Sequence, residues 1–165
     1  MDVIADLTIA AIVVNYGTPA LTIACVESLL KSDGIDPHVF VIDNKSPDDS
    51  VERLNAAFGD NPSVTVVARK KNDGYTGGNN AGFALARKLL AKYAFVLNSD
   101  TTVHADCLRL LAEEAERTEG AAIVSPCIFF GDPANELWFG GGRFSLWRGR
   151  PVHIGFHKPG SAGLQ

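Results

Sequence analysis

The chain has little cysteine, no long hydrophobic run and no dense cluster of positive charge, and each shortage excludes a class of protein. The three cysteines, Cys25, Cys107 and Cys127, form no CxxC pair, so neither a zinc ribbon nor a disulfide framework is indicated. The longest apolar run, residues 9–14, is far too short to cross a bilayer. The N-terminus lacks the basic and apolar regions of a signal peptide. These features predict a cytoplasmic protein with buried, reduced thiols and no transmembrane segment.

The charge balance argues against a dedicated nucleic-acid-binding protein. The 15 Lys and Arg residues are outnumbered by 19 Asp and Glu residues, which gives a formal net charge of −4. Basic residues gather only at 69–71 and, more loosely, at Arg143, Arg148 and Arg150. With 46% apolar and 21% charged residues, the composition is that of a folded domain with a real core. We therefore expect no nucleic-acid partner.

Short apolar runs alternate with helical patterns along most of the chain. Residues 8–14 are almost all apolar and β-branched, as in a strand buried on both faces of a parallel sheet. Thr18 and Pro19 then fit the N-cap and first turn of a helix. The other predicted strands are residues 39–42, 64–67, 93–97 and 121–124. The other predicted helices are residues 50–58, a helix whose start lies at residues 77–82, and residues 105–117. This alternation predicts a three-layer α/β/α, Rossmann-like fold with a mainly parallel sheet and right-handed crossovers.

The pattern changes near residue 126, where glycines and aromatic residues dominate and no helix is predicted. We divide the chain into an α/β core at residues 1–125, a region of short strands and loops at 126–157, and a small polar tail at 158–165. Trp138 and Trp147 lie in the second region, and core or sheet packing explains them better than stacking on a sugar.

Polar residues follow four of the predicted strands at the point where each strand ends. In a parallel sheet all carboxyl ends lie at one edge, where ligands of open α/β folds bind. The polar segments are Asn15 and Tyr16, Asp43 and Asn44, the loop at residues 69–80, and residues 98–100. Their convergence predicts a binding site, and Asp100 is its strongest candidate for a chemically active residue.

The glycine-rich segment at residues 74–82 enters a helix and has two interpretations. Backbone N–H groups at a helix start hold anions, and absent side chains let a ligand approach closely. The alternative is a glycine-rich turn capped by Asn79 or Asn80. The segment lacks the GK[ST] ending of a Walker A loop. A dinucleotide-binding fold is disfavoured because the first strand-to-helix turn, residues 15–19, holds a single glycine.

Asp100 also has two interpretations. A carboxylate beside a phosphate site is typical of Mg²⁺ or Mn²⁺ binding, because these hard cations prefer oxygen ligands and share them with phosphates. Alternatively, Asp100 is a turn or N-cap residue before the helix at 105–117. Thr102 and Asp106 are better placed for capping, which favours metal binding.

Four ordered motifs resemble glycosyltransferase family 2, most closely its rhamnosyltransferase-like branch. They are VVNYGTP at 13–19, VIDNKSPDDS at 41–50, KNDGYTGGNNAGFALA at 71–86 and VLNSDT at 96–101. The resemblance implies a GT-A fold, with a nucleotide-diphosphate-sugar half followed by an acceptor half that is incomplete in this chain. It implies a donor linked to dTDP, UDP or GDP, with dTDP-rhamnose the leading candidate, and a glycan or lipid-linked acceptor.

The resemblance also assigns roles to residues. Asn15 and Tyr16 would line the nucleoside pocket, Asp43 would contact the base, and Asp100 would bind the metal. The remaining implied contacts to the nucleotide sugar come from Asn72, Gly74, Gly77, Gly78, Asn79 and Asn98. Asn98 departs from the acidic first position of the family's DxD motif, which implies weaker or substrate-dependent metal binding.

No acidic residue follows Glu136, so the general base that the family's acceptor half supplies has no counterpart here. We expect the donor-binding portion of an inverting glycosyltransferase involved in polysaccharide biosynthesis, with the catalytic base unassigned. The alternative is a non-catalytic nucleotide-sugar-binding or assembly module. A sheet without its acceptor half would expose apolar surface, which predicts self-association as a homodimer. A peripheral location at a membrane is compatible with these features.

Overall fold

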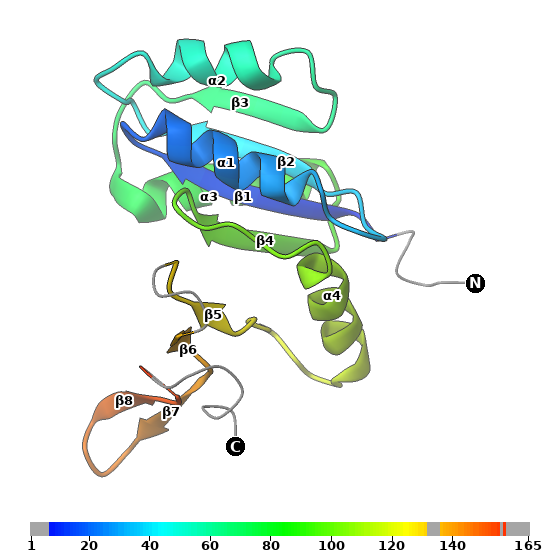
Figure 1. The fold of residues 1–165 in the computed structure, drawn as a ribbon, viewed down its shortest axis with the longest axis vertical. Coiled ribbons are helices and arrows are strands. Elements are labelled where there is room, and N and C mark those ends of the chain that lie inside the picture. The colour runs from blue at the N-terminus through cyan, green and yellow to red at the C-terminus, as the bar shows by residue number, and fades with distance from the viewer. Residues whose placement is uncertain (1–6, 132–135, 156, 158–165) are drawn as a thin grey trace. The chain divides into compact units, whose positions relative to one another are not determined.

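Four parallel strands form the central sheet in this computed structural model, which describes residues 7–131, 136–155 and 157. The strands are β1 (Ile9–Asn15), β2 (His38–Asp43), β3 (Val64–Ala68) and β4 (Tyr93–Asn98), in the order β3-β2-β1-β4. The helices are α1 (Pro19–Leu29), α2 (Ser50–Phe58), α3 (Gly74–Lys88) and α4 (Cys107–Arg117). Figure 1 shows the strands side by side, with α1 across the middle of the sheet. The predicted α/β fold with a parallel sheet is confirmed.

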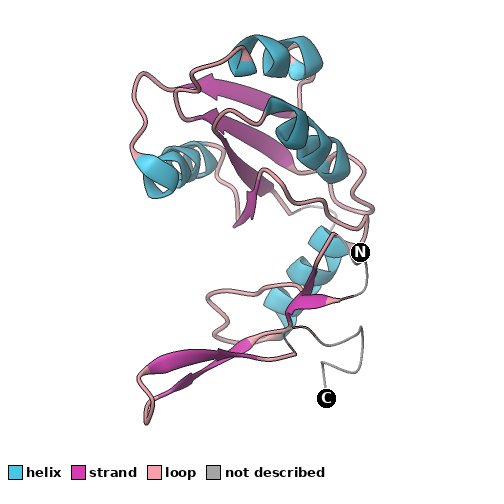
Figure 2. Cartoon of the chain, turned by 60° about the vertical axis from the view of Figure 1, so that its left-hand side comes forward, coloured by secondary structure: helices cyan, strands magenta, loops and turns pink. Residues whose placement is uncertain are grey.

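Alternation of side chains along β1 divides the core into two layers. Ile9, Ala11 and Val13 face a cluster that includes side chains of α1, α2 and α4. Ala10 and Ile12 face the opposite cluster, to which α3 contributes. Figure 2 shows α3 on the other side of the sheet from α1 and α2. Every residue of β1 is buried, as its unbroken apolar run predicts.

Helix α3 begins at Gly74, three residues earlier than the sequence pattern indicates. Gly78 and Gly82 explain the glycine-rich composition, because they face β1 with no room for a side chain. A Cβ on Gly78 would lie 2.7 Å from Cγ1 of Val14, and one on Gly82 would overlap Ile12. The expected glycine-rich loop is therefore mostly helix, whose glycines let it pack directly on the sheet.

The chain divides into two compact units, Met1–Glu113 and Glu114–Gln165. The second unit contains two antiparallel pairs: β5 (Ile128–Phe129) with β6 (Leu137–Phe139), and β7 (Gly142–Ser145) with β8 (Arg150–His153). The domain boundaries expected at residues 125 and 157 stay predictions. The tail at residues 158–165 lies outside the described residues. No helix in the described part of the chain is both long and apolar enough to cross a bilayer.

Two expectations for this part of the chain are wrong. Residues 121–124 form no strand, and the side chain of Ile123 is 90% exposed, so this short apolar run adds no fifth strand to the parallel sheet. Trp147 does not pack in a core, because it lies at the turn between β7 and β8 with its side chain 99% exposed. The side chain of Trp138 is exposed, and its ring lies 6.3 Å from that of Phe139.

Candidate functional site

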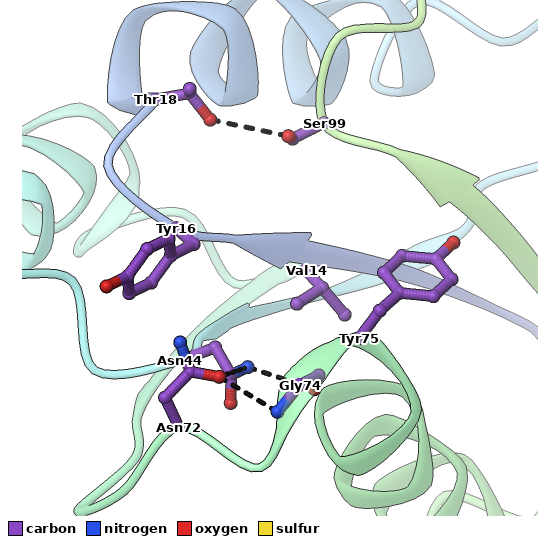
Figure 3. A pocket seen from close by; sticks show the side chains of 8 residues that line it. All are labelled: Val14, Tyr16, Thr18, Asn44, Asn72, Gly74, Tyr75 and Ser99. Carbon is purple, nitrogen blue, oxygen red and sulfur yellow. Dashed lines mark hydrogen bonds between the residues drawn. The ribbon is translucent and has the colours of Figure 1, made fainter.

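A pocket of about 340 Å³ opens at the carboxyl ends of β1, β2 and β4. Figure 3 shows it between the two exposed tyrosines, Tyr16 after β1 and Tyr75 in the first turn of α3, which are 53% and 51% exposed. The described residues that line it are Val14, Tyr16, Thr18, Asn44, Asn72, Gly74, Tyr75 and Ser99. The site therefore lies where the polar strand ends predict it.

Strand geometry decides which polar side chains reach this pocket. Consecutive residues of a strand point to opposite faces of the sheet. Val14 lines the pocket from the side of the sheet that α3 covers. Asn15 is the next residue, and its side chain contacts Thr22 of α1 on the other side. Asp43 and Asn44 divide in the same way, because Asn44 lines the pocket and Asp43 does not.

Asn44 holds the first turn of α3 against the end of β2. Its Nδ2 donates to Oδ1 of Asn72 at 2.7 Å and to the backbone oxygen of Gly74 at 3.0 Å. Its Oδ1 accepts a 2.6 Å hydrogen bond from Nη1 of Arg69. Arg69 also forms a 2.8 Å ion pair with Asp73, the residue just before α3. One buried amide therefore connects the end of β2 to Asn72 and Gly74 in the pocket wall (Figure 3).

Asn15 and Asp43 form a second network behind the pocket. Nδ2 of Asn15 donates to Oδ2 of Asp43 at 2.8 Å, and Oδ1 of Asn15 accepts from the Thr22 hydroxyl at 2.7 Å. Asp43 also accepts from the backbone N–H and the hydroxyl of Ser46. Both side chains are fully buried. Their expected contacts with a nucleoside stay predictions, and a base that reached Asp43 would have to compete with three internal donors.

Asp100 lies in the turn after β4, directly after the pocket residue Ser99, and its carboxylate is exposed. It has no hydrogen-bond or ion-pair partner among the described residues. Burial raises the pKa of the nearby Cys25 thiol to about 12, with a further contribution from the negative charge of Asp100. A thiol with so high a pKa stays protonated at neutral pH.

The residues at this edge fit a divalent cation that a ligand helps to hold. No group of three His, Cys, Asp or Glu side chains in the described ranges could hold an ion without such help. Mg²⁺ and Mn²⁺ are commonly bound through one or two carboxylates together with substrate phosphates. Asp100 supplies one free carboxylate. Asn98 is exposed, and its backbone oxygen accepts from the N–H of Thr101.

The remaining predicted site residues lie within α3. Gly77 and Gly78 are in its first two turns, and Gly78 packs on Val14. Asn79 is buried, and its Nδ2 donates to the backbone oxygen of Tyr75 at 3.0 Å. Its Oδ1 has no partner among the described residues. None of the three lines the pocket, so their contact with a ligand stays a prediction.

Three of the ten predicted site residues line the pocket, namely Tyr16, Asn72 and Gly74. Three other lining residues, Asn44, Tyr75 and Ser99, lie in the polar segments that the sequence places at the site, although the sequence indicates no individual role for them. The sequence did not indicate the remaining two, Val14 and Thr18. The alternation of side chains along a strand was the signal that could have identified Val14. Because the apolar run ends at Val14, every second residue before it lies on the same face of the sheet.

A parallel sheet in the order β3-β2-β1-β4, with helices on both faces and a pocket at its carboxyl edge, defines an α/β protein of the doubly wound type. The model of one family, glycosyl transferase family 2, matches residues 10–162 of the chain. The chain therefore belongs to glycosyl transferase family 2.

Two curated relatives show how much of a longer protein the chain spans. It is 35% identical over 124 residues to the succinoglycan biosynthesis protein ExoO of Rhizobium meliloti, covering 75% of this chain and 33% of that protein. It is 29% identical over 100 residues to the chondroitin synthase of Pasteurella multocida, covering 61% of this chain and 10% of that protein. The chain thus spans about a third or less of these relatives.

Two solved structures share the fold. TarS residues 1–349 of S. aureus with UDP has a TM-score of 0.58 at 16% identity, covering 76% of this chain and 43% of that chain. The mannosyltransferase PcManGT of Pyrobaculum calidifontis, with GDP-Man and Mn²⁺, has the same TM-score and identity over 76% of this chain and 37% of that chain. The predicted GT-A-like fold is confirmed.

Proposed function

We propose that this chain is the donor-binding portion of an inverting glycosyltransferase and holds a nucleotide-diphosphate sugar with Mg²⁺ or Mn²⁺ in the pocket at the carboxyl edge of the sheet. The observation that carries the proposal is the pocket itself, which lies between two exposed tyrosines and has an unpartnered carboxylate next to its lining. Family membership supports it. So do the ligands in the two related structures, UDP and, with Mn²⁺, GDP-Man.

The pocket supplies the groups that such a ligand needs. Tyr16 and Tyr75 offer aromatic surface for a base or a sugar ring. Asn72 and Ser99 offer polar atoms for hydroxyl groups. Asp100 would hold the cation, which neutralises the charge that develops on the departing diphosphate. We favour dTDP-rhamnose as the donor on the resemblance of the motifs, with UDP- and GDP-linked sugars as the alternatives.

The acceptor side carries a separate proposal. Deprotonation of an acceptor hydroxyl requires a general base. Glu136, the last acid of the chain, interacts with His157 in the second unit, and Asp132 lies outside the described residues. We therefore leave the base unassigned and propose donor binding, with a glycan or lipid-linked acceptor in the whole protein. Donor binding without transfer is also what a non-catalytic module would show.

Isothermal titration calorimetry with UDP, GDP and dTDP, each with and without Mn²⁺, tests donor binding. We expect micromolar to millimolar binding of one nucleotide that Mn²⁺ strengthens. The Asp100→Asn variant should lose about tenfold or more in Mn²⁺-dependent affinity, since it removes the charge on the only proposed protein ligand. Asp60→Asn, which changes an exposed residue after α2, is the matched control. If a folded chain binds none of the three nucleotides, the proposal is wrong.

A further inference from the structure

The hairpin formed by β7 and β8 presents an unusual tip. Ser145 pairs with Arg150, so residues 146–149 form the turn. Leu146 is 90% exposed and Trp147 is 99% exposed, although a tryptophan usually buries most of its large ring. Two adjacent exposed apolar side chains at the tip of a hairpin are well placed to insert into a lipid bilayer or to contact a binding partner.

The same hairpin is strongly cationic in an otherwise acidic chain. Arg143, Arg148 and Arg150 are all exposed, and no carboxylate of the described residues forms an ion pair with them. No Asp or Glu follows Glu136, whereas the whole chain has a net charge of −4. The tip therefore combines exposed apolar side chains with unpaired positive charge, and its natural complement is an apolar surface with negative charge at its boundary.

We propose that the β7–β8 hairpin is an interfacial anchor that inserts Leu146 and Trp147 into the surface of an anionic lipid bilayer. Tryptophan favours the membrane–water interface, and arginines near the surface are attracted to anionic headgroups. A strand rises about 3.4 Å per residue, so Arg143 lies roughly 10 Å from Leu146 along the hairpin. That span matches the roughly 5–10 Å depth of interfacial insertion.

The side chains at the tip favour a bilayer over other polyanions. A nucleic acid would attract the three arginines, but it offers no hydrocarbon region for Leu146. A second copy of this acidic chain would bury Leu146 and Trp147, but its own hairpin would bring three more unpaired arginines to the contact. The anchor is independent of what the pocket binds, so its test does not depend on the proposed function.

Vesicle co-sedimentation of the full chain tests the anchor. We expect binding to vesicles of phosphatidylcholine and phosphatidylglycerol (3:1) that exceeds binding to pure phosphatidylcholine and falls at 1 M salt. Leu146→Ser/Trp147→Ser should bind at least tenfold more weakly, since two apolar side chains lose their burial. Arg148→Gln/Arg150→Gln should lose about fivefold per charge.

Matched variants control for apolarity and for charge. Ile123→Ser removes a side chain that is also 90% exposed in the same unit. Arg87→Gln/Lys88→Gln removes two exposed charges at the end of α3. Both should bind vesicles like the unchanged chain. Equal losses in these controls would overturn the proposal, because general apolarity or net charge would then explain binding.

Fluorescence provides a measurement that needs no change at the tip. The chain has two tryptophans, so Trp138→Phe leaves Trp147 as the sole indole. Its emission should shift to shorter wavelength with phosphatidylglycerol-containing vesicles and be quenched by brominated lipids. Unchanged emission would overturn the proposal. So would DNA binding without vesicle binding, or a lipid-free dimer in light scattering that Leu146→Ser/Trp147→Ser dissociates.

Discussion

Asn44 is the residue on which the pocket wall most depends. Its amide donates to two acceptors and accepts from Arg69, so each of its polar atoms is used. The orientation of the amide follows from this network, since the reverse orientation would place an oxygen against two other oxygens. This arrangement makes a conservative change informative.

We expect Asn44→Asp to weaken both the fold and nucleotide binding. The substitution keeps the acceptor for Arg69 but replaces the donor with an oxygen that faces Oδ1 of Asn72 and the backbone oxygen of Gly74. The free energy of unfolding should fall by about 1–3 kcal/mol. Nucleotide affinity should fall about tenfold as the first turn of α3 moves away.

Urea denaturation and calorimetry measure the two effects. Asn55→Asp makes the same chemical change at an exposed position of α2 and should alter the free energy of unfolding by less than about 0.5 kcal/mol. If Asn44→Asp has the same free energy of unfolding and the same nucleotide affinity as the unchanged chain, the amide network does not hold the pocket wall.

At the scale of secondary-structure elements, the sequence predicts strands better than it predicts α3. The apolar runs place all four strands of the sheet to within one residue at each end, and α2 spans the predicted residues 50–58. These elements have strong local patterns. Helix α3 does not, because Gly78 and Gly82 are selected by contact with Val14 and Ile12, which belong to a strand far away in sequence. Tertiary packing there overrides the low helix propensity of glycine.

Packing of α3 on β1 predicts that Gly82→Ala is destabilising even though alanine favours helix. The added methyl group would overlap the side chain of Ile12. Overpacking lowers the free energy of unfolding by about 1–3 kcal/mol. At most sites this loss outweighs the gain of about 1 kcal/mol from the higher helix propensity of alanine. Gly131→Ala is the control, since a Cβ there meets no atom within 4 Å.

A double-mutant cycle with Ile12→Ala isolates the contact. In the Ile12→Ala background, Gly82→Ala should cost clearly less than in the unchanged chain, because the overlapping atoms are gone. Thermal or urea unfolding of the four chains gives the coupling free energy. Equal costs in both backgrounds would mean that the close approach of α3 is not what requires glycine.

For the whole molecule, the first unit contains nearly all of the buried apolar residues. Both core clusters are built from residues up to Ala112, and the pocket lining ends at Ser99. The sequence pattern indicated the edge of this unit at which the pocket lies, because strand ends are local signals. It did not indicate the exposed tip at Trp147, because an aromatic residue in a short strand region is equally typical of a core. Self-association stays a prediction, and light scattering measures it.

A chain truncated after Gly120 should therefore fold and keep its nucleotide affinity. It retains the central sheet, helices α1 to α4 and the described pocket lining, and it loses strands β5 to β8 of the second unit. The midpoint of thermal unfolding should change by less than about 4 °C, which corresponds to less than about 1 kcal/mol for a unit of this size. Circular dichroism and calorimetry with Mn²⁺ and the nucleotide that the full chain prefers provide the comparison.

Vesicle binding, in contrast, should be lost with the hairpin. A truncated chain that folds but no longer binds nucleotide would place part of the donor site beyond Gly120, whereas one that keeps vesicle binding would remove the hairpin from the proposed anchor.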